Sequence, residues 1–392
     1  MTTSANDPTA ADPTPDGSTT DGGETGGGAT DGSSTDGSAT DGSSADSSTS
    51  DTTTADTPTA PRTRRRRALR WAATAGAVLA VTGVGAALAD GVALWRRPER
   101  VTATLPGSPA GGSTVLLIGT DARTADQSGD DDVRYGSEAA NPGERADVIL
   151  ALRTDDDGTV RLLEIPRDLL VVGDKGAPVR LTTTLLGGPS GTTEALCRSL
   201  GLGVDHVVEV RFPGLRSIVD SVGGVQVTLD RSIRDTYTKF HLDAGTHLLN
   251  GDDVLAYVAA RKIEVLQPDG TWKADTASAG NRSSKGANVL RDLASRIDPS
   301  PLHPVETQRQ AWAITGALAV DQQLSPTDAP GLWSSLQALP SVDTMHLPTS
   351  PTTGVVPITR LEPGAGAVLA EFEGSNTPAP GCRPVLPNAV RP

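Results

Sequence analysis

The chain has 392 residues, which leaves room for one or two domains, and its formal net charge at pH 7 is −14. Charged residues make up 21% and aromatic residues 3% of the chain, and the only basic run is Arg62–Arg67. An acidic chain of this kind offers no broad basic surface to a phosphate backbone, so we expect no nucleic-acid partner.

The N-terminal segment is of low complexity. Residues 1–60 consist mainly of Asp, Gly, Ser, Thr, Ala and Pro, with DGSS and TDGS recurring and no Lys or Arg. Such a segment buries too little apolar surface to offset the entropy lost on ordering. We expect residues 1–67 to be a disordered tail. A solvated tail without a specific partner is favoured over an interaction or phosphorylation tail.

An apolar stretch follows the basic run. Trp71–Ala89 is long enough, at ~1.5 Å per residue, to come close to the ~30 Å hydrocarbon core of a bilayer. Val92–Trp95 extends it, so we expect a transmembrane helix over residues 71–95. The arginines of Arg62–Arg70 place the tail in the cytoplasm and the rest of the chain outside the cell. The late start and the length of the stretch disfavour a cleaved signal peptide.

Residues 96–112 are rich in Pro and Gly and are expected to be a linker. Strand-like and helix-like segments then alternate, which predicts an α/β sandwich over residues 113–375 with helices on both faces of a sheet. A short C-terminal tail, residues 376–392, completes the chain. The clearest expected elements are strands Val115–Ile118, Val148–Leu152 and Val160–Ile165, and helices Thr192–Leu200 and Phe212–Val222.

Acids and arginines gather at the ends of the first three expected strands. The carboxylates there suit Mg²⁺, and the arginines could clamp phosphoryl oxygens through two hydrogen bonds each. For any one pair, solvated turn charges would be the favoured interpretation, but their recurrence on three consecutive strands favours a site. The candidates are Asp121, Asp147 and Asp168 for the metal, and Arg145, Arg167 and Arg180 for the phosphate.

Two cysteines are present, Cys197 and Cys382. Outside a cell they would either form a disulfide that ties the C-terminal tail to helix Thr192–Leu200 or remain two independent buried thiols. The sequence does not separate these alternatives. Two cysteines without a CxxC spacing make a zinc site unfavourable.

The order of the motifs resembles the LytR-CpsA-Psr family of bacterial cell-wall ligases, with a composition like that of actinobacterial members. The resemblance covers residues 113–300 and continues more weakly to residue 372. It implies a three-layer α/β/α sandwich with a mixed central sheet. The matching motifs, in chain order, are GTDAR, RADVILALRTD, IPRD, RLTTTLLGGP, VDHVVEVRFPGLRSIVDSVGGV, LDAGTHLLNGDDVLAYVAAR and NRSSKGANVL.

The resemblance implies an enzyme that transfers a glycopolymer from a membrane-bound polyprenyl-pyrophosphate carrier to a hydroxyl group of peptidoglycan. It would be a Mg²⁺-dependent phosphotransferase, with Asp121 and Asp147 at the metal. Asp168 is the candidate general base. The pyrophosphate would be bound by Arg145, Arg167, Arg180, Arg261 and Arg282, of which Arg145, Arg167 and Arg261 would also serve catalysis.

The last family motifs are degenerate. Ala259 replaces the first arginine of a YVRSR-like motif, and Ala279, Lys285, Gly286 and Ala287 stand where the family usually has Asp, Arg, Gln and Gln. Each lost arginine removes charge-assisted hydrogen bonds of ~1.5–3 kcal/mol. The alternative function is therefore a catalytically weakened member that binds polyprenyl-phosphate lipids or partner ligases. A membrane-bound transcription attenuator is disfavoured, because the cytoplasmic part has no helix-turn-helix pattern.

A polyprenyl tail also requires an apolar groove. Leu185–Leu186 and the apolar faces of Thr192–Leu200 and Phe212–Val222 are the candidates. For most of these positions, ordinary core packing is the alternative.

Overall fold

The computed structural model describes residues 86–121, 143–236, 238–260, 262–275, 282–297, 299–300, 302–352 and 358–385, with a few isolated helical residues before position 86. The chain divides into two units, 1–68 and 69–392, and all described residues belong to the second. The expected disordered tail and most of the apolar stretch Trp71–Ala89 lie outside the described residues. Within the described ranges, no helix combines the length and apolar character needed to cross a membrane.

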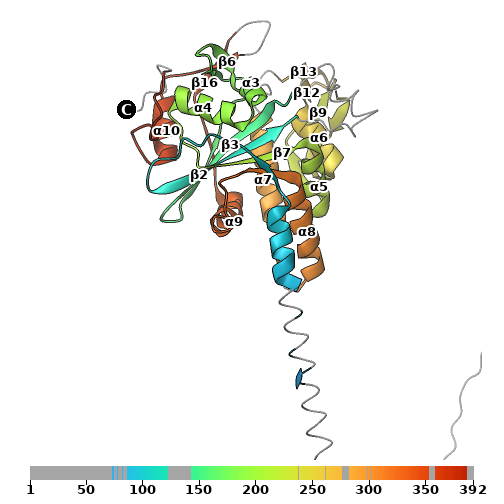
Figure 1. Ribbon diagram of the computed structural model, residues 1–392. Helices are drawn as coiled ribbons and strands as arrows, with labels where there is room; N and C mark the ends of the chain where they lie inside the picture. The colour runs from blue at the N-terminus through green and yellow to red at the C-terminus, as the bar shows by residue number, and fades with distance from the viewer. Residues whose placement is uncertain are drawn as a thin grey trace, which may run out of the picture. The chain divides into compact units, whose positions relative to one another are not determined.

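A seven-stranded mixed sheet forms the centre of the domain (Figure 1), which confirms the expected mixed α/β fold. The parallel pairs are β1·β14, β2·β7 and β4·β15, and the remaining neighbours are antiparallel. In sheet order the strands are β1 (Glu99–Val101), β14 (Leu318–Asp321), β7 (His206–Arg211), β2 (Gly112–Thr120), β3 (Ala146–Asp155), β4 (Val160–Glu164) and β15 (Thr344–His346).

Both faces of this sheet are apolar, as expected for strands buried on both sides. Leu116 and Ile118 face one core with helices α3 (Leu181–Thr184), α4 (Pro189–Leu200) and α10 (Ala365–Glu373). Leu117 and Leu150 belong to a second core on the opposite side. The helices there are α5 (Phe212–Ser221), α6 (Gly251–Ala259), α7 (Arg282–Arg296), α8 (Pro304–Ala317) and α9 (Ala329–Ala338).

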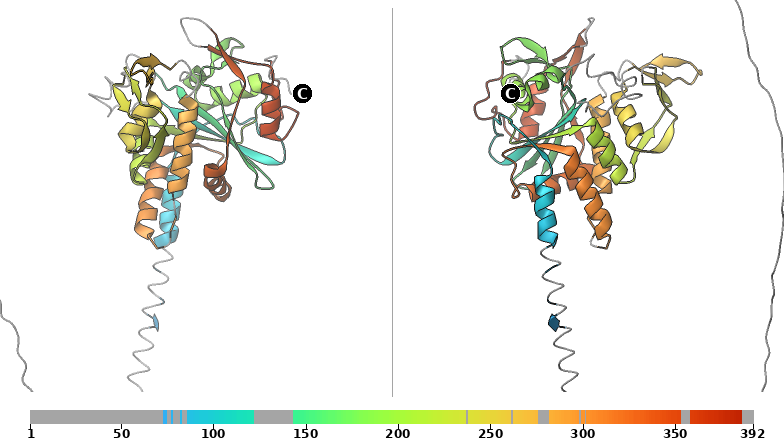
Figure 2. Two further views of the ribbon diagram at one scale, coloured as in Figure 1. Left: turned by 180° about the vertical axis from the view of Figure 1, so that it is seen from behind. Right: turned by 45° about the vertical axis from the view of Figure 1, so that its right-hand side comes forward.

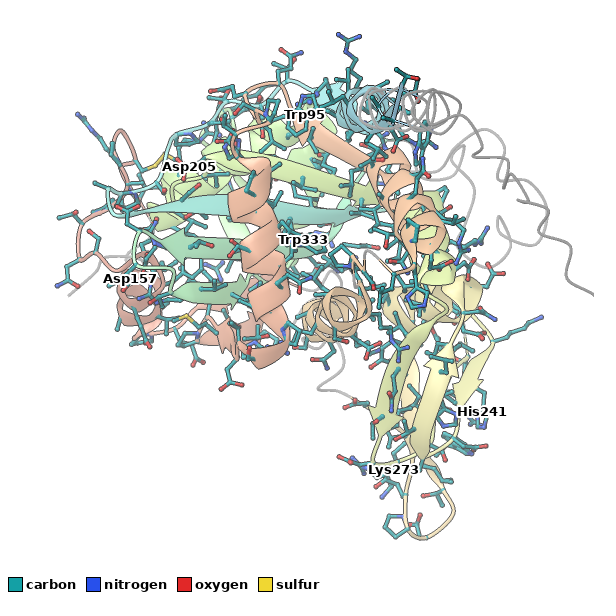
Figure 3. The ribbon with its side chains drawn as sticks, turned by 90° about the horizontal axis from the view of Figure 1, so that it is seen from below. Trp95, Asp157, Asp205, His241, Lys273 and Trp333 are labelled. Carbon is teal, nitrogen blue, oxygen red and sulfur yellow. A yellow bond between two sulfur atoms is a disulfide. The ribbon has the colours of Figure 1, made fainter. Side chains whose placement is uncertain are left out.

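Smaller sheets surround this core. One of them stands out from the body of the domain near the labelled His241 and Lys273 (Figure 3); its order is β10 (Phe240–Leu242), β9 (Ile233–Asp235), β12 (Ile263–Leu266) and β13 (Trp272–Ala274). The two-stranded pairs are β8 (Val225–Leu229) with β11 (Gly245–Leu249), β5 (Leu170–Val172) with β6 (Pro178–Arg180), and β16 (Thr349–Thr352) with β17 (Ile358–Leu361). Two 3₁₀ turns, η1 (Leu185–Gly187) and η2 (Leu339–Ser341), complete the elements.

The segment expected to be a linker belongs to the domain instead. Residues 99–101 form edge strand β1, and Ala103 and Leu105 pack against the core beneath α4. Trp95, expected at a membrane interface, packs with Val115 and Val320 on the sheet. A three-residue edge strand buries too little to leave a pattern in the sequence, so composition alone indicated a linker.

The C-terminal tail is also attached to the domain in its first part. Cys382 forms a disulfide with Cys197 of α4, and Ala379 is buried beside them. The backbone amide of Ala379 donates to the carbonyl of Gly201, 2.9 Å away. Residues 376–385 are thus held against α4 by covalent and backbone contacts.

Candidate functional site

The strand directions bring the expected site residues to one end of the central sheet. β2, β4, β7 and β15 all end there, and the antiparallel strand β3 begins there. Asp121 directly follows β2, and Asp147 is the second residue of β3. The amide of Arg145 donates to Asp121 Oδ1 at 2.8 Å, and the amide of Asp121 donates to the carbonyl of Arg145 at 3.1 Å. These bonds fix the two loops side by side.

Asp147 begins a row of alternating charges. Arg167, which follows β4, contacts Asp147 through Nη1 and lies 3.5 Å from Asp168 through Nε. Arg180, at the end of β6, lies 3.3 Å from the other oxygen of Asp168. The amide of Thr182 donates to the carbonyl of Arg167 at 2.8 Å, which holds the Arg167 loop against α3. Four expected residues therefore form one ion-paired row.

The row is largely buried, and one of its hydrogen-bond donors has no acceptor among the described residues. Asp147 and Asp168 are 6% and 8% exposed, and the Arg167 side chain is 17% exposed. Arg167 Nε is buried and makes no hydrogen bond with the part of the chain that is described. A buried unsatisfied guanidinium nitrogen costs free energy, and a phosphoryl oxygen is a fitting acceptor for it.

Asp168 does not have the surroundings expected of a general base. Its carboxylate lies between the guanidinium groups of Arg167 and Arg180. A carboxylate held by charge-assisted contacts with two guanidinium groups fits the positioning of these arginines.

Two further expected arginines cannot be placed at this site. Arg261 lies outside the described residues. Arg282 is the first residue of α7, and only its backbone is described. Ala279 is likewise outside the described ranges.

Three polar residues at the same end of the sheet were not expected from the sequence. Glu164, the last residue of β4 and 3% exposed, accepts a hydrogen bond from Ser284 Oγ at 2.7 Å. His346, the last residue of β15, lies with Nδ1 2.8 Å from the same Glu164 oxygen and is 58% exposed. Because β15 is a short edge strand far along the chain, only the parallel pairing of β4 with β15 brings His346 here.

Lys285 keeps a positive charge at the position where the family motif usually has an arginine. It lies on the first turns of α7, is 8% exposed, and its Nζ lies 5.0 Å from the centre of the Tyr257 ring. Cation–π contact with a buried ring stabilises an ammonium group in such surroundings. Burial raises the pKa of Tyr257 above its usual value, so the ring remains neutral beside the lysine.

Ala259, by contrast, stands where the family usually has an arginine, and its side chain packs in the hydrophobic core. It ends α6, is 8% exposed, and clusters with Phe212 and Leu255. An arginine at this position would have to displace apolar neighbours or reach beyond them.

An apolar cavity of about 200 Å³ lies beneath the sheet between α5, α7, α8 and α9. Among its described lining residues, Asp147 alone carries a charge. Figure 3 labels Trp333 on α9, on the side that faces α7 and α8. The lining residues that α7 contributes recur at helical spacing, and Ile297 directly follows the helix: Gly286, Val289, Leu290, Leu293, Ala294 and Ile297.

The cavity follows α7 for most of the length of the helix. Gly286 and Ile297 are eleven residues apart, which is about 16 Å along an α-helix. Gly286 and Asp147 line the end near the charged row, and Ile297 and Gln337 line the far end. A Cβ at position 286 would lie 2.6 Å from Val148, so the glycine allows α7 to approach β3 closely.

Of the three apolar faces expected to form a groove, one borders the cavity. Phe212, Leu215 and Ile218 of α5 line the cavity. Leu185 and the buried face of α4 instead pack in the core on the other side of the sheet. Apolar periodicity identified all three faces, but only the topology decides which face borders the cavity.

Electrostatics at the neighbouring end of β7 are also unusual. Burial raises the pKa of Glu209 to about 7, and the nearby Glu144 adds to this rise. Glu209 is 1% exposed, and its Oε1 has no hydrogen-bond partner among the described residues. Arg211 bonds instead to Glu99 and Glu144, which raises the pKa of its guanidinium further.

The carboxylates fit a magnesium site whose ligands come partly from the substrate better than a site built from protein ligands alone. No group of three or more His, Cys, Asp or Glu side chains poised for a metal occurs in the described ranges. Asp121, directly after β2, and Asp147, at the start of β3, are two buried carboxylates on neighbouring strands. Mg²⁺ is commonly held by one or two carboxylates together with substrate phosphate oxygens, and this donor set matches that arrangement.

Comparisons with known proteins agree on one family. The LytR_cpsA_psr family model matches residues 92–271. LcpB of Corynebacterium glutamicum, a probable cell wall biosynthesis protein, is 32% identical over 206 residues, which cover 50% of this chain and 49% of LcpB. TagT of Bacillus subtilis, a polyisoprenyl-teichoic acid–peptidoglycan teichoic acid transferase, is 28% identical over 243 residues, 60% of this chain and 67% of TagT.

A solved structure extends this agreement to the fold. The LytR-Csp2A-Psr enzyme from Actinomyces oris is 30% identical, with a TM-score of 0.58, over 71% of this chain and 96% of that one. The chain spans about half the length of the corynebacterial relative. The sheet, the ordered motifs and these relatives together show that the chain belongs to the LytR-CpsA-Psr family.

Proposed function

We propose that the protein transfers a glycopolymer from a polyprenyl-pyrophosphate carrier to peptidoglycan during cell-wall assembly. The polyisoprenyl-linked substrate named for TagT supports this class of reaction. The chain would be anchored by one transmembrane helix within residues 71–95. Its N-terminus would be cytoplasmic and its domain extracellular, with no nucleic-acid partner.

The observation that carries the proposal is the junction of an apolar cavity with a charged row. Asp147 belongs to both, because it lines the cavity and is ion-paired with Arg167. A ligand that fills both parts needs a long apolar chain and a multiply charged anionic head. Polyprenyl pyrophosphate has this composition.

In the reaction, a peptidoglycan hydroxyl would attack the phosphorus that bears the glycopolymer. A new phosphorus–oxygen bond would form, the bond to the bridging oxygen would break, and polyprenyl phosphate would leave with the electron pair. Arg167 and Arg180 would neutralise charge on the leaving group, with Arg145, Arg261 and Arg282 assigned to the same group by the family resemblance. The hydroxyl proton would pass to a base that we do not assign.

Mg²⁺ would be held by Asp121 and Asp147 and would supply further charge neutralisation at the pyrophosphate. Asp147 is then shared between the ion and Arg167. Asp168 would hold Arg167 and Arg180 in the orientation in which both can reach phosphoryl oxygens.

A second candidate function is lipid binding with slow transfer. Ala259 favours it, because a methyl group buried against Phe212 stands where the family usually carries a guanidinium. Gly286 and the undescribed Ala279 depart from the family pattern as well. Binding of the pyrophosphate would persist through the remaining arginines, while the developing charge would be stabilised less well.

The deciding experiment measures release of polyprenyl phosphate from a lipid-linked glycopolymer analogue by the full-length protein, with Mg²⁺ and peptidoglycan fragments. Turnover that is lost in Arg167→Ala and retained in Arg198→Ala supports the ligase; Arg198 is a half-exposed arginine of α4 paired with Glu194. Tight lipid binding without turnover supports the second candidate. Absence of both binding and turnover would contradict the two together.

A further inference from the structure

Two of the most exposed large apolar side chains lie where α7 and α8 are joined. Leu302 is 83% exposed and Val305, in the first turn of α8, is 78% exposed. Exposed apolar groups at the tip of a helical hairpin cost free energy in water and are typical of an interaction surface. We refer to Leu302 and Val305 as the hairpin tip.

The hairpin tip lies beside the segment that enters the domain. Residues 86–96 are helical and lie alongside α8 at the lower end of the domain (Figures 1 and 2). Trp312 Nε1 donates to Asp90 Oδ1 at 3.0 Å, and Arg97 Nε donates to the carbonyl of Trp312 at 3.1 Å. The Arg97 guanidinium also lies 4.6 Å from the Trp312 ring centre. These contacts fix the level of Asp90 along α8.

The position of Asp90 along α8 shows how far the hairpin tip lies from the end of the apolar stretch Trp71–Ala89. Trp71–Ala89 ends one residue before Asp90. Val305 precedes Trp312 by seven residues, so it lies about 10 Å further along α8, away from the sheet. Residue 86 lies at this same lower end of its helix (Figure 1), and Leu88 there is 67% exposed. The hairpin tip therefore extends past the point at which the chain becomes apolar.

We propose that the hairpin tip inserts into the outer leaflet of the membrane and docks the domain on the bilayer surface. The depth agrees with interfacial segments, which bury apolar groups ~5–10 Å into the boundary between headgroups and acyl chains. Among the described charged residues nearby, Arg309 pairs with Glu306 and Arg296 pairs with Asp292. Insertion is thus driven by apolar burial, without a requirement for anionic lipid.

If the domain docks in this orientation, one end of the cavity faces the membrane. The cavity runs along α7 from Asp147 to Ile297, and Ile297 is at the end of α7 that leads to the hairpin tip. A carrier lipid would extend its tail from the bilayer into the cavity without crossing water. This consequence rests on the proposed function, whereas the docking itself rests on the hairpin tip and the helix contacts.

The test places nitroxide labels on the full-length protein in nanodiscs of neutral phosphatidylcholine. Leu302→Cys and Val305→Cys are labelled without reductant, so that the Cys197–Cys382 disulfide stays closed. The matched control is Leu186→Cys, a 53%-exposed leucine between α3 and α4 at the opposite, upper end of the domain (Figure 1). Collision with oxygen and with a water-soluble nickel chelate is measured for each label.

We expect the labels at 302 and 305 to be several-fold more accessible to oxygen than to the chelate, and the label at 186 to show the reverse. Equal chelate accessibility at 302 and 186 would overturn the docking proposal. The outcome is independent of transfer: insertion without turnover would contradict only the ligase, and turnover without insertion would contradict only the docking.

Discussion

At the scale of single residues, the site is organised by Arg167. Its guanidinium contacts Asp147 through Nη1 and lies 3.5 Å from Asp168 through Nε, which makes no hydrogen bond among the described residues. The fixed fork of donors matters here, because one side chain serves two carboxylates and a phosphoryl group. A flexible lysine with a point charge cannot meet the same set of acceptors.

Replacement of Arg167 should therefore lower turnover even when charge is kept. Loss of one charge-assisted bond of ~1.5–3 kcal/mol that forms in the transition state corresponds to a roughly 10- to 100-fold fall in kcat. We expect Arg167→Ala to reach this range and Arg167→Lys to recover only part of the loss. The release of polyprenyl phosphate is measured for both variants. Full activity of Arg167→Lys would show that the planar guanidinium donors are not required.

Glu209 makes stability depend on pH in an unusual direction. Its folded-state pKa of about 7 lies above its ordinary value of 4.5, so the folded protein binds this proton more tightly than the unfolded chain does. The contribution is favourable at low pH and is lost as pH rises from about 4.5 to about 7. Above that range the buried carboxylate destabilises the domain.

Glu209→Gln should consequently raise the melting temperature at pH 8 and leave it unchanged at pH 4. The gain at pH 8 is on the order of 3 kcal/mol, since the shift from 4.5 to about 7 spans roughly 2.5 pKa units and each unit corresponds to ~1.4 kcal/mol. Thermal unfolding at the two pH values measures it. The exposed Glu371→Gln serves as control, and an equal effect of both substitutions at pH 8 would contradict the buried origin of the shift.

At the scale of elements, α7 connects the charged row to the cavity. Its residues between Gly286 and Ile297 form one continuous apolar face. The opposite face is polar; Asp292, for example, accepts from the amide of Gln226 at 2.7 Å. The small residues Gly286 and Ala294 keep the cavity open, because a larger side chain at either position would occupy the space beside the sheet.

Ala294→Phe should fill part of the cavity and compete with a lipid tail. We expect binding of a long-chain polyprenyl phosphate to weaken at least tenfold, while binding of inorganic pyrophosphate stays unchanged. Calorimetric titration with the two ligands separates tail from head. Unchanged affinity for the long-chain lipid would show that the tail binds elsewhere.

The elements also show what the sequence can and cannot predict. Apolar runs such as Val115–Ile118 located the central strands, and acid–arginine pairs at their ends located Asp121, Asp147 and Arg167. Strand β1 escaped notice because a three-residue edge strand has no periodicity. His346 and Glu164 escaped notice because their proximity depends on the parallel pairing of an edge strand from the C-terminal part of the chain.

At the scale of the whole molecule, the domain is closed by a long-range covalent link. The Cys197–Cys382 disulfide joins residues separated by 185 positions and holds the C-terminal segment on α4. A cross-link that closes so long a loop restricts the unfolded chain strongly. Oxidising surroundings, such as those outside a cell, favour such a bond.

The double substitution Cys197→Ala with Cys382→Ala should lower the free energy of unfolding by ~2–4 kcal/mol. Chemical denaturation of the full-length protein in detergent measures the loss. Parent protein treated with reductant provides the matched comparison, because it opens the same link without changing the sequence. A variant as stable as the oxidised parent would show that the link does not stabilise the fold.

For the molecule as a whole, we infer that a single lipid occupies both the α7 cavity and the charged row. A crystal structure of the protein with a polyprenyl-pyrophosphate bound tests this claim most directly. We expect the tail along α7 between Gly286 and Ile297, with the head within hydrogen-bond distance of Arg167. A tail bound on the α4 face of the sheet, or a head remote from Arg167, would contradict it.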